Sequence, residues 1–265
     1  MRQTKAKKIL QHVQKTYDEI AGEFSASRQY LGKDFEIFKT YLQNGQKMAD
    51  IGCGNGRLIN FLKKNLENFD YIGIDNSEAI LSEARKNHRN YKFINGDQLK
   101  LPLVDNSVDI IFNIRAFHHI PSKKLRLKAL EEMKRVMKNN GILILTVWDL
   151  WQSKKTKYLL KGIFRWIFTF GAYSYNDTFI PWGKEKIPRY YHAFRMHELQ
   201  NLVKKTGFYV LENYNDKILG GNSANQNRDL VIIARKKNGL PRVEILDIPF
   251  DNVTIDEAAN EVISR

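Results

Sequence analysis

The stretch Asp50-Ile-Gly-Cys-Gly-Asn-Gly56 decides the fold that this sequence predicts. It follows a short apolar run, 47–51, and precedes an amphipathic stretch, 57–64, which predicts a turn between a strand and a helix. Glycine at every second position permits positive φ angles and lets a ligand approach the backbone, and a helix N-terminus favours an anion. Because the spacing is G-x-G-x-G and not the G-x-G-x-x-G of dinucleotide folds, a carboxylate is favoured over a pyrophosphate.

The alternation of strands and helices continues along the chain. Further apolar runs at 71–74, 91–94, 108–114 and 142–148 predict strands, and amphipathic stretches at 77–87 and 123–137 predict helices between them. Two helices are predicted before this core (9–24 and 35–42), and a helix (196–205) and two strands (208–213 and 230–234) joined by a Gly/Asn-rich hairpin loop (219–225) after it. The pattern indicates an α/β fold: a doubly wound, mostly parallel seven-stranded sheet with helices on both faces.

Composition limits the classes of protein. The 265 residues carry 43 basic and 29 acidic side chains, a net charge of +14, which favours an anionic partner: nucleic acid, an anionic membrane surface or an acidic substrate. A single cysteine, Cys53, excludes a disulfide-stapled scaffold and a thiolate zinc cluster, and favours a reducing cytoplasm. No apolar run reaches the ~18 residues of a transmembrane helix, and no signal peptide is predicted.

The charge is unevenly distributed along the chain. Residues 239–265 hold two basic and six acidic side chains, so residues 1–238 carry +18. A basic stretch followed by Gly239 and Pro241 marks the change and predicts a domain boundary. We therefore divide 1–238 into N-terminal helices (1–45), a core (46–150), an insertion on the substrate side (151–195) and a C-terminal helix with strands (196–238), followed by an acidic tail, 239–265, that can begin a second domain.

Acidic residues end the second and third predicted strands. Asp75 can accept hydrogen bonds from both hydroxyls of a ribose; the alternative is an N-cap for the next helix, a role that Ser77 can also fill. Asp97 can accept from an exocyclic amine while Leu99 packs on a base; the alternative is a turn residue. With the glycine turn, this makes three candidate ligand-binding features at three successive strand ends.

This set of motifs resembles the class I S-adenosylmethionine-dependent methyltransferases. The stretches that carry the resemblance are 50–56, 73–75, 96–97, 105–112 and 130–143, and it covers 46–148. It implies the Rossmann-like methyltransferase fold, with an antiparallel last strand, and S-adenosylmethionine as the cofactor. By the resemblance Gly52, Gly54 and Gly56 hold the methionine portion, Asp75 the ribose and Asp97 the adenine. The other cofactor contacts that we assign are Asp50, Asn55, Asn76, Gln98, Leu99 and Asn113.

The flanks resemble a narrower family, the wobble-uridine tRNA methyltransferases. The matching stretches are 17–28, the pair His118-His119, 179–182 and 188–195; the likeness spans 10–235 and departs at a longer insertion, 152–176. Enzymes of that family methylate the carboxylate of 5-carboxymethyluridine in the anticodon, which gives the methyl ester. The resemblance therefore implies tRNA as a partner. By analogy with related eukaryotic enzymes, it also implies a small zinc-containing activator subunit.

The string Arg189-Tyr-Tyr-His192 suits such a substrate. A carboxylate is already deprotonated near neutral pH, so methyl transfer requires positioning but no general base. We expect Arg189 or Arg195 to bind the carboxylate, and Tyr190, Tyr191 and His192 to contact the base. The alternative is that the aromatic members belong to the core and Arg195 caps a helix.

The pair His118-His119 follows the fourth predicted strand, at the carboxyl edge of the sheet. One of the two can orient the substrate or close the cofactor pocket; the alternative is a loop histidine bonded to backbone. No metal site is expected, because no second pair of His or Cys has ligand spacing.

The insertion contains a basic amphipathic helix. Lys157, Lys161 and Arg165 recur every four residues, opposite a broad apolar face that includes Leu160 and Ile167. Such a helix can form an RNA-contacting lid, lie on a membrane surface or, as the default, pack on the sheet.

The tail stretch 241–258 resembles the start of an N-acetylmannosaminyltransferase family that acts on lipid-linked sugars. No catalytic segment of that family matches, so we assign the tail no activity. Together with the amphipathic helix, it favours an alternative function, methyl transfer to a small molecule or a lipid-linked sugar. The function that we predict is transfer of a methyl group from S-adenosylmethionine to a tRNA wobble uridine by a cytoplasmic enzyme.

Overall fold

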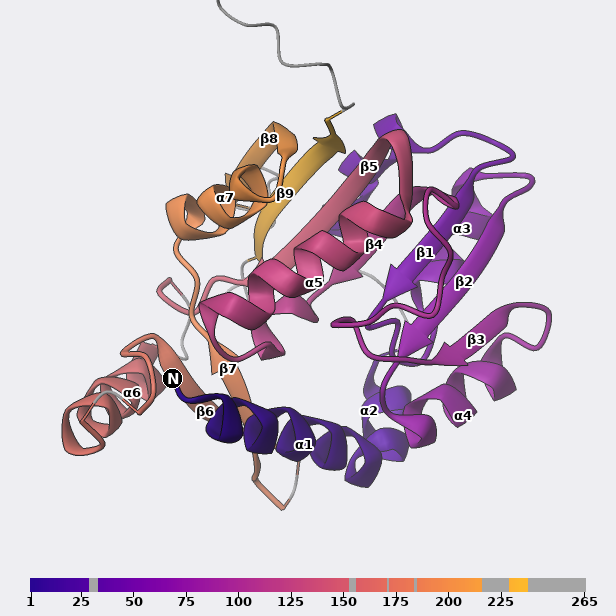
Figure 1. Cartoon of the computed structure of the whole chain (residues 1–265). Helices are drawn as coiled ribbons and strands as arrows, with labels where there is room; N and C mark the ends of the chain where they lie inside the picture. The colour runs from indigo at the N-terminus through magenta and orange to yellow at the C-terminus, as the bar shows by residue number, and fades with distance from the viewer. Residues whose placement is uncertain (29–32, 153–155, 171, 184, 216–228, 238–265) are drawn as a thin grey trace, which may run out of the picture.

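The centre of the molecule is a seven-stranded sheet with the strand order β3-β2-β1-β4-β5-β9-β8 (Figure 1). The computed structural model describes residues 1–28, 33–152, 156–170, 172–183, 185–215 and 229–237. The strands are β1 (Lys47–Ile51), β2 (Asp70–Asp75), β3 (Lys92–Asn95), β4 (Val108–Ile114), β5 (Met137–Trp148), β8 (Phe208–Asn215) and β9 (Asp229–Lys236). Neighbours from β3 to β5 pair in parallel, whereas β9 is antiparallel to both β5 and β8. The predicted sheet and its antiparallel last strand are therefore confirmed.

The order of the strands reverses between β1 and β4. The chain fills the sheet from β1 outward to β3 and then returns to the other side of β1 for β4 and β5. At such a point the loops leave the sheet in opposite directions, and the crevice at the carboxyl ends of the strands binds ligands. The turn 52–56 follows β1 directly and so lies at this crevice.

Helices cover both faces of the sheet, as predicted. On one face pack α5 (Lys123–Val136) and α7 (Met196–Lys205), and on the other α3 (Leu58–Asn65) and α4 (Glu78–Asn87). The segment predicted as a helix over 35–42 is a 3-10 helix, η1 (Lys33–Tyr41), which buries Phe35 and Phe38 on the second face. A short 3-10 turn, η2 (Phe117–His119), follows β4.

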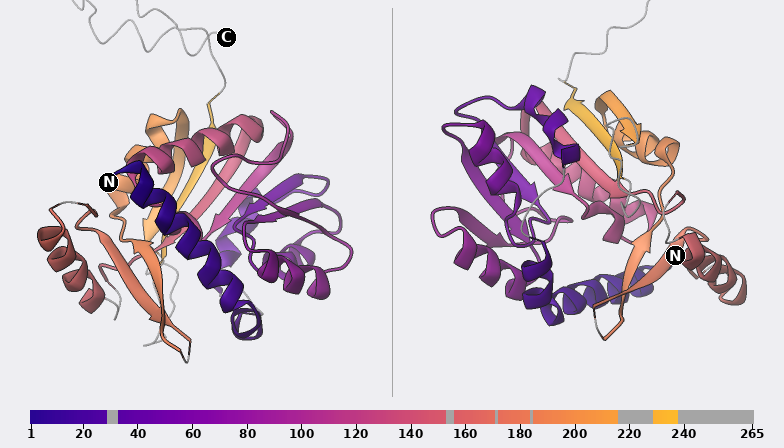
Figure 2. Two further views of the ribbon diagram at one scale, coloured as in Figure 1. Left: turned by 60° about the horizontal axis from the view of Figure 1, so that its bottom comes forward. Right: turned by 180° about the vertical axis from the view of Figure 1, so that it is seen from behind.

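The two N-terminal helices, α1 (Gln3–Glu19) and α2 (Ala21–Ser27), lie across the carboxyl ends of the strands (Figures 1 and 2). The sequence predicts a single helix over 9–24, but α1 ends at Glu19, and its C-cap Ile20 donates its N–H to the carbonyl of Thr16 at 3.1 Å. Ile9 and Val13 of α1 pack on Tyr190. The crevice is thereby covered on the side away from the sheet.

The insertion forms a helix and a separate two-stranded sheet. These are α6 (Thr156–Phe168) and the antiparallel strands β6 (Asp177–Trp182) and β7 (Ile187–His192). This hairpin is not among the elements predicted from the sequence. Strand β7 contacts α1 and η2, which brings its side chains to the carboxyl edge of the main sheet, while α6 packs on β6 (Figure 2). None of the helices that the structure describes is long and apolar enough to cross a membrane.

The C-terminal strands β8 and β9 pair as the predicted hairpin requires. The predicted loop between them, 219–225, lies outside the described residues. The acidic tail, 239–265, also lies outside them, so the domain boundary near 239 stays a prediction.

Candidate active site

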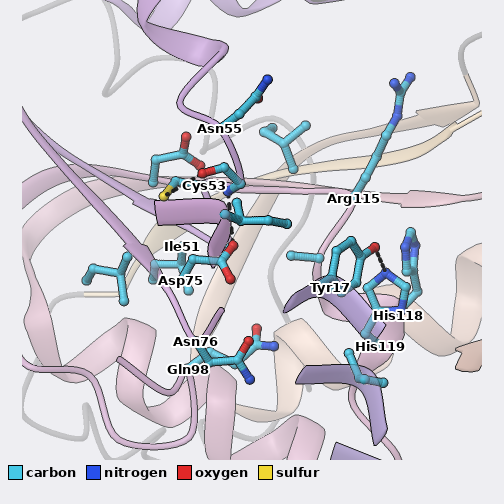
Figure 3. A pocket seen from close by; sticks show the side chains of 18 of the residues that line it. Tyr17, Ile51, Cys53, Asn55, Asp75, Asn76, Gln98, Arg115, His118 and His119 are labelled. Atoms are coloured by element: carbon cyan, nitrogen blue, oxygen red, sulfur yellow. Dashed lines mark hydrogen bonds between the residues drawn. The ribbon is translucent and has the colours of Figure 1, made fainter. Parts of the chain in front are cut away.

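One pocket lies at the carboxyl ends of the strands, between the sheet, α1 and β7 (Figure 3). Of the site residues proposed from the sequence, it is lined by Asp50, Gly52, Gly54, Asn55, Asp75, Asn76, Asp97, Gln98, His118, His119, Arg189 and Tyr191. The remaining proposed residues lie outside its lining: Gly56, Leu99, Asn113, Tyr190, His192 and Arg195. The structure therefore brings the glycine turn and part of the arginine–tyrosine string to one cavity.

The backbone conformation of the glycine turn leaves no room for a side chain at Gly52. Gly52 and Gly54 have φ angles of 76° and 55°, and a Cβ at Gly52 would overlap the Cβ of Ala116. The N–H of Gly54 donates to Asp75 Oδ2 at 3.0 Å, which joins the turn to the end of β2. Asn55 donates its side-chain amide to the carbonyl of Arg28 at 2.9 Å and so ties the turn to the end of α2.

Asp75 presents a carboxylate with remaining acceptor capacity. Its Oδ2 accepts from Gly54 and its Oδ1 from the N–H of Ser77, each at 3.0 Å. The N–H of Asn76 also bonds to this carboxylate, whose two oxygens have about four acceptor sites and so keep acceptor capacity for a ligand hydroxyl. Burial raises the pKa of Asp75. Ser77 is the residue whose side chain caps α4, by accepting from the N–H of Ile80, so the N-cap role falls to Ser77.

Asp50 lies at the end of β1, beneath the turn. Its Oδ2 accepts a hydrogen bond from the Tyr71 hydroxyl at 2.8 Å. Burial raises the pKa of Asp50 to about 7, although the Tyr71 bond and the charge of Arg57 oppose the rise. The charge of this carboxyl therefore changes near neutral pH.

Of the site residues proposed at the end of β3, some line the pocket and one packs in the hydrophobic core. Asp97 lines the pocket while its Oδ1 accepts from the N–H of Leu99 at 2.9 Å, the turn role that was the alternative. The side chain of Leu99 packs in the hydrophobic core, which turns it away from any base in the pocket. Asn113 donates to Gln98 Oε1 at 3.3 Å from behind. Gln98 is thus the side-chain amide that this end offers to a ligand.

The Arg-Tyr-Tyr-His string lies on β7, and strand geometry divides it. Successive side chains of a strand point to opposite faces, so Arg189 and Tyr191 line the pocket while Tyr190 and His192 point away. On the far side the Tyr190 hydroxyl donates to Asp177 Oδ1 at 2.7 Å, and His192 Nδ1 lies 2.8 Å from the same oxygen. The structure therefore does not bring Tyr190 and His192 to a substrate base.

The far side of β7 is a buried polar cluster that holds the hairpin to the body. Burial raises the pKa of Asp177, but its bonds to His192 and Tyr190 outweigh burial and leave the pKa below its usual value. Arg126 of α5 lies 3.9 Å from the same carboxylate. Arg195 also stays away from the pocket, because it is the N-cap residue of α7 and its guanidinium lies 4.1 Å from the ring centroid of Trp151.

Arg189 enters the pocket within a ring of aromatic side chains. Its guanidinium carbon lies 5.3 to 5.8 Å from the ring centroids of Tyr17, Trp148, Trp182 and Tyr191. Its Nη1 donates to the Tyr17 hydroxyl at 3.3 Å, whereas its Nε is buried and has no hydrogen-bond partner among the described residues. A buried, charged donor without a partner is costly, so this guanidinium is suited to an anion that a ligand supplies.

His119 is neutral and held in one orientation. Burial and the charge of Arg189 lower the pKa of His119 to about 3. Its Nδ1 lies 2.7 Å from the carbonyl oxygen of Tyr190; since a carbonyl only accepts, Nδ1 carries the proton. Its Nε2 then accepts from the Tyr17 hydroxyl at 2.8 Å (Figure 3). The Tyr17 oxygen in turn accepts from Arg189. This series of hydrogen bonds orients Arg189 and leaves His119 no role as a general base.

His118 and Tyr191 complete this wall of the pocket. His118 Nδ1 accepts from the backbone N–H of Trp148 at 3.1 Å, so this nitrogen is unprotonated. Tyr191 stacks on the Trp148 ring with centroids 5.0 Å apart. Its hydroxyl is buried without a hydrogen-bond partner in the part of the chain that the structure describes, and burial raises the pKa of Tyr191. Tyr191 can therefore donate a hydrogen bond to a ligand.

Three arginines that were not proposed from the sequence also line the pocket: Arg28, Arg57 and Arg115. Burial, then repulsion by Arg115 and Arg28, lowers the pKa of Arg57 to about 10. Burial, then Arg189 and Arg115, lowers the pKa of Arg28. Arg115 pairs with Asp229 at 2.6 Å. Arg57 and Arg115 follow the carboxyl ends of β1 and β4 in the chain. A position after a strand end is also what identifies Asp75 and Asp97 in the sequence, so the two arginines could have been predicted in the same way.

Similarity to known proteins agrees with this geometry. The sequence model of one family, described as a methyltransferase domain, matches residues 42–244. The chain belongs to this family. The methyl donor of this methyltransferase is S-adenosylmethionine, and the pocket fits that cofactor because the glycine turn lets it approach the backbone, while Asp75 offers a carboxylate and Arg57 a guanidinium.

Among its relatives the methyltransferase is 31% identical over 202 residues to a protein of Encephalitozoon cuniculi named as a methyltransferase, a match that covers 76% of this chain and 88% of that one. It is 27% identical over 229 residues to the tRNA (carboxymethyluridine(34)-5-O)-methyltransferase of Schizosaccharomyces pombe, covering 78% and 92%. An enzyme of the same name in Xenopus tropicalis is 31% identical over 152 residues, but the match spans only 23% of that longer protein.

Solved structures share the fold. A SAM-dependent methyltransferase of Methanosarcina mazei superposes with a TM-score of 0.63 at 23% identity, covering 76% of this chain and 97% of that one. A methyltransferase of Haloferax volcanii, solved in complex with the Trm112 methyltransferase activator, gives a TM-score of 0.57 at 16% identity, covering 86% and 99%. At these identities the likeness concerns the fold alone.

Proposed function

We propose that the methyltransferase transfers a methyl group to the carboxylate of 5-carboxymethyluridine at the wobble position of tRNA and forms the methyl ester. The observation that carries the proposal is Arg189, whose buried Nε lacks a partner among the described residues and which shares a pocket with Asp75. A planar guanidinium binds a carboxylate through two parallel N–H donors. The names of the fission yeast and frog relatives support the same substrate.

In this proposal the turn 52–56 and its neighbours hold the cofactor. Arg57 receives the methionine carboxylate beside the turn, and Asp75 accepts from the ribose hydroxyls. Gln98 and Asp97 face the adenine. When bound, S-adenosylmethionine supplies an electrophilic methyl group on a sulfonium.

The side chains on the opposite side of the pocket from the turn act only by positioning the acceptor. The acceptor carboxylate is deprotonated near neutral pH, so no side chain has to remove a proton. Arg189 binds this carboxylate and is held by Tyr17, which His119 orients in turn. Tyr191 donates its unpaired hydroxyl to the substrate. Methyl transfer to an acceptor that is held in the right orientation is faster than transfer to a freely diffusing carboxylate.

The basic surface suits tRNA. Residues 1–238 carry +18, and phosphates attract such a surface over long range. Arg28 and Arg115, at the pocket beside Arg189, are placed to contact a phosphate next to the target nucleoside. A small zinc-containing activator subunit, implied by the family resemblance, is included as a partner. The Haloferax volcanii neighbour was solved with Trm112, which is named as a methyltransferase activator. With tRNA as its substrate, we place the enzyme in the cytoplasm.

Mass spectrometry of tRNA nucleosides tests this function. Deleting the gene should remove the methyl ester of 5-carboxymethyluridine and cause the free acid to accumulate, and a plasmid copy should reverse both changes. Nucleosides that are identical with and without the gene would overturn the tRNA assignment. In that case a small carboxylic acid methylated by the purified protein would become the substrate to pursue.

A further inference from the structure

The outward side of α6 is apolar. Leu160, Phe164, Ile167 and Phe168 are 59%, 60%, 53% and 76% exposed, and Phe170, just after the helix, is 99% exposed. Spacings of three and four place the helical residues on one side. We call these five side chains the α6 apolar face. A surface helix normally turns its apolar side inward, so this one requires a partner to cover it.

Packing on the hairpin fixes the helix in this orientation. The inward side carries Leu159, which is buried, and Gly162, where a Cβ would lie 2.5 Å from the carbonyl oxygen of Asp177. Arg165 is also turned toward the hairpin, with its guanidinium 4.6 Å from the ring centroid of Phe179. If α6 were rotated to bury the apolar face, a bulky side chain would take the position of Gly162 against the backbone at Asp177. The helix therefore packs on β6 of the hairpin through Leu159 and Gly162, while the rest of its apolar side, including Leu160 and Ile167, is left facing outward.

Basic residues border the α6 apolar face. Lys157 and Lys161 are exposed on the same helix, which contains no acidic residue. The start of α1 lies beside the end of the helix, because Lys5 Nζ is 3.7 Å from the ring centroid of Tyr173 and Arg165 approaches the same ring at 5.5 Å (Figure 1). Residues 1–17 hold five basic and no acidic side chains. Apolar and positively charged groups thus meet at one surface.

We propose that the α6 apolar face, together with Lys157 and Lys161, docks the methyltransferase on an anionic membrane surface. The apolar side chains enter the boundary between headgroups and acyl chains, while the lysine ammonium groups stay at the level of the lipid phosphates. The helix lies in the plane of the membrane surface and does not cross it.

Other occupants match this surface less well. Two copies joined through α6 would bring the lysines of one copy near those of the other, and each chain already carries +14. RNA satisfies the lysines, but its phosphates leave Leu160 and Ile167 in contact with water. An anionic bilayer complements both the charge and the apolar area.

Co-sedimentation with vesicles tests the proposal. Purified protein is mixed with vesicles of phosphatidylcholine alone, and with vesicles of phosphatidylcholine and phosphatidylglycerol in equal parts. We expect binding to the mixed vesicles that weakens with salt. The double variant Leu160→Ser/Phe164→Ser should bind about a hundredfold more weakly, since burial of each side chain is worth about tenfold. Replacing Lys157 and Lys161 by Ala should cost roughly fivefold for each lysine.

The matched control is Val104→Ser. Val104 is 74% exposed but lies in the segment between β3 and β4, so this variant should bind vesicles like the wild type. Unchanged S-adenosylmethionine affinity in all variants shows that they are folded. The proposal is overturned if the wild type ignores the mixed vesicles at low salt, or if the α6 double variant binds them as well as Val104→Ser does. It is also overturned if ultracentrifugation finds a wild-type dimer that the double variant abolishes while vesicles are not bound.

Discussion

The two walls of the pocket are built in different ways. One wall consists of the turn 52–56 and the ends of β2 and β3, where the backbone of the turn and the Asp75 carboxylate come from successive strand ends. The other wall consists of side chains from distant elements: Tyr17 of α1, His119 of η2 and Arg189 of β7. Local backbone geometry shapes the first wall, whereas tertiary contacts between helix, turn and hairpin shape the second.

Because the two walls are built differently, we expect them to bind different ligands. Backbone groups at a switch point suit a ligand that is the same in every member of a fold family, because their positions follow from the strand order. Side chains from separate elements can change one at a time and so suit the variable partner in the reaction. We therefore expect changes in the first wall to alter cofactor binding and changes in the second to alter turnover.

The largest expected effect is on the first wall. Asp75→Ala removes acceptors for two ribose hydroxyls, each hydrogen bond to a charged group being worth roughly 1.5–3 kcal/mol, so S-adenosylmethionine affinity should fall more than about a hundredfold. Calorimetric titration measures it, and thermal unfolding without the cofactor checks that the turn survives the loss of the Gly54 and Ser77 bonds. Unchanged affinity would remove Asp75 from the cofactor site.

On the second wall, Arg189→Lys should lower turnover about a hundredfold, because lysine lacks the planar two-donor fork and misplaces the carboxylate. Cofactor affinity should stay within about twofold of the wild type, well under the ~1.4 kcal/mol that a tenfold change represents. Arg195→Lys is the matched control: Arg195 lies on Trp151, outside the pocket lining, so both quantities should be retained. Equal turnover in the two variants would show that Arg189 does not bind the substrate.

Two neighbouring tyrosines test the division of β7. Tyr190→Phe removes a donor from the buried Asp177 carboxylate and should cost about 1–3 kcal/mol of unfolding free energy while turnover persists. Tyr191→Phe removes a hydroxyl without a partner among the described residues, so stability should persist while turnover falls roughly tenfold. Urea unfolding and methyl-transfer assays on both variants measure this. The reverse pattern would mean that β7 presents its other side to the substrate.

The smallest expected effect is the loss of stability that His119 causes between pH 7 and 6, which is less than about 1.4 kcal/mol. Because burial and Arg189 lower the pKa of His119 to about 3, its neutral form is the one that the fold accommodates. Its contribution to stability is complete above the unfolded pKa of about 6.5 and is lost as the pH falls toward 3, by up to about 1.4 kcal/mol per pH unit. His119→Asn retains a donor for the Tyr190 carbonyl but does not titrate. Denaturant titrations at pH 7, 6 and 5 should therefore show a steeper loss in the wild type, and parallel curves would contradict the neutral assignment.

The first wall could be predicted from the sequence because its signals are local. The turn 50–56, Asp75 and Asp97 each follow a strand that apolar runs identify, and the parallel topology then places strand ends together. The packing of Leu99 in the core could not be predicted, since a turn residue's side-chain direction depends on the Asp97 bond to its N–H.

The second wall was predicted only in part because its geometry is non-local. The chemistry of the string 189–192 is readable from the sequence, whereas the strand period that turns Tyr190 and His192 away applies only because 187–192 forms a strand of a hairpin that the sequence does not predict. The role of Tyr17 could not be predicted, because its bonds to His119 and Arg189 span 102 and 172 residues of sequence. The outward apolar side of α6 depends on the close approach of Gly162 to β6, which helical periodicity alone does not specify.

A crystal structure with S-adenosylhomocysteine tests the division of the pocket most directly. We expect the two ribose hydroxyls to donate to the Asp75 carboxylate and the amino-acid carboxylate to lie at the turn 52–56. The guanidinium of Arg189 should then make no contact with the bound product and should face the open side of its sulfur. A structure in which Arg189 binds the carboxylate of S-adenosylhomocysteine, or in which the ribose lies away from Asp75, would contradict the assignment of separate cofactor and acceptor walls.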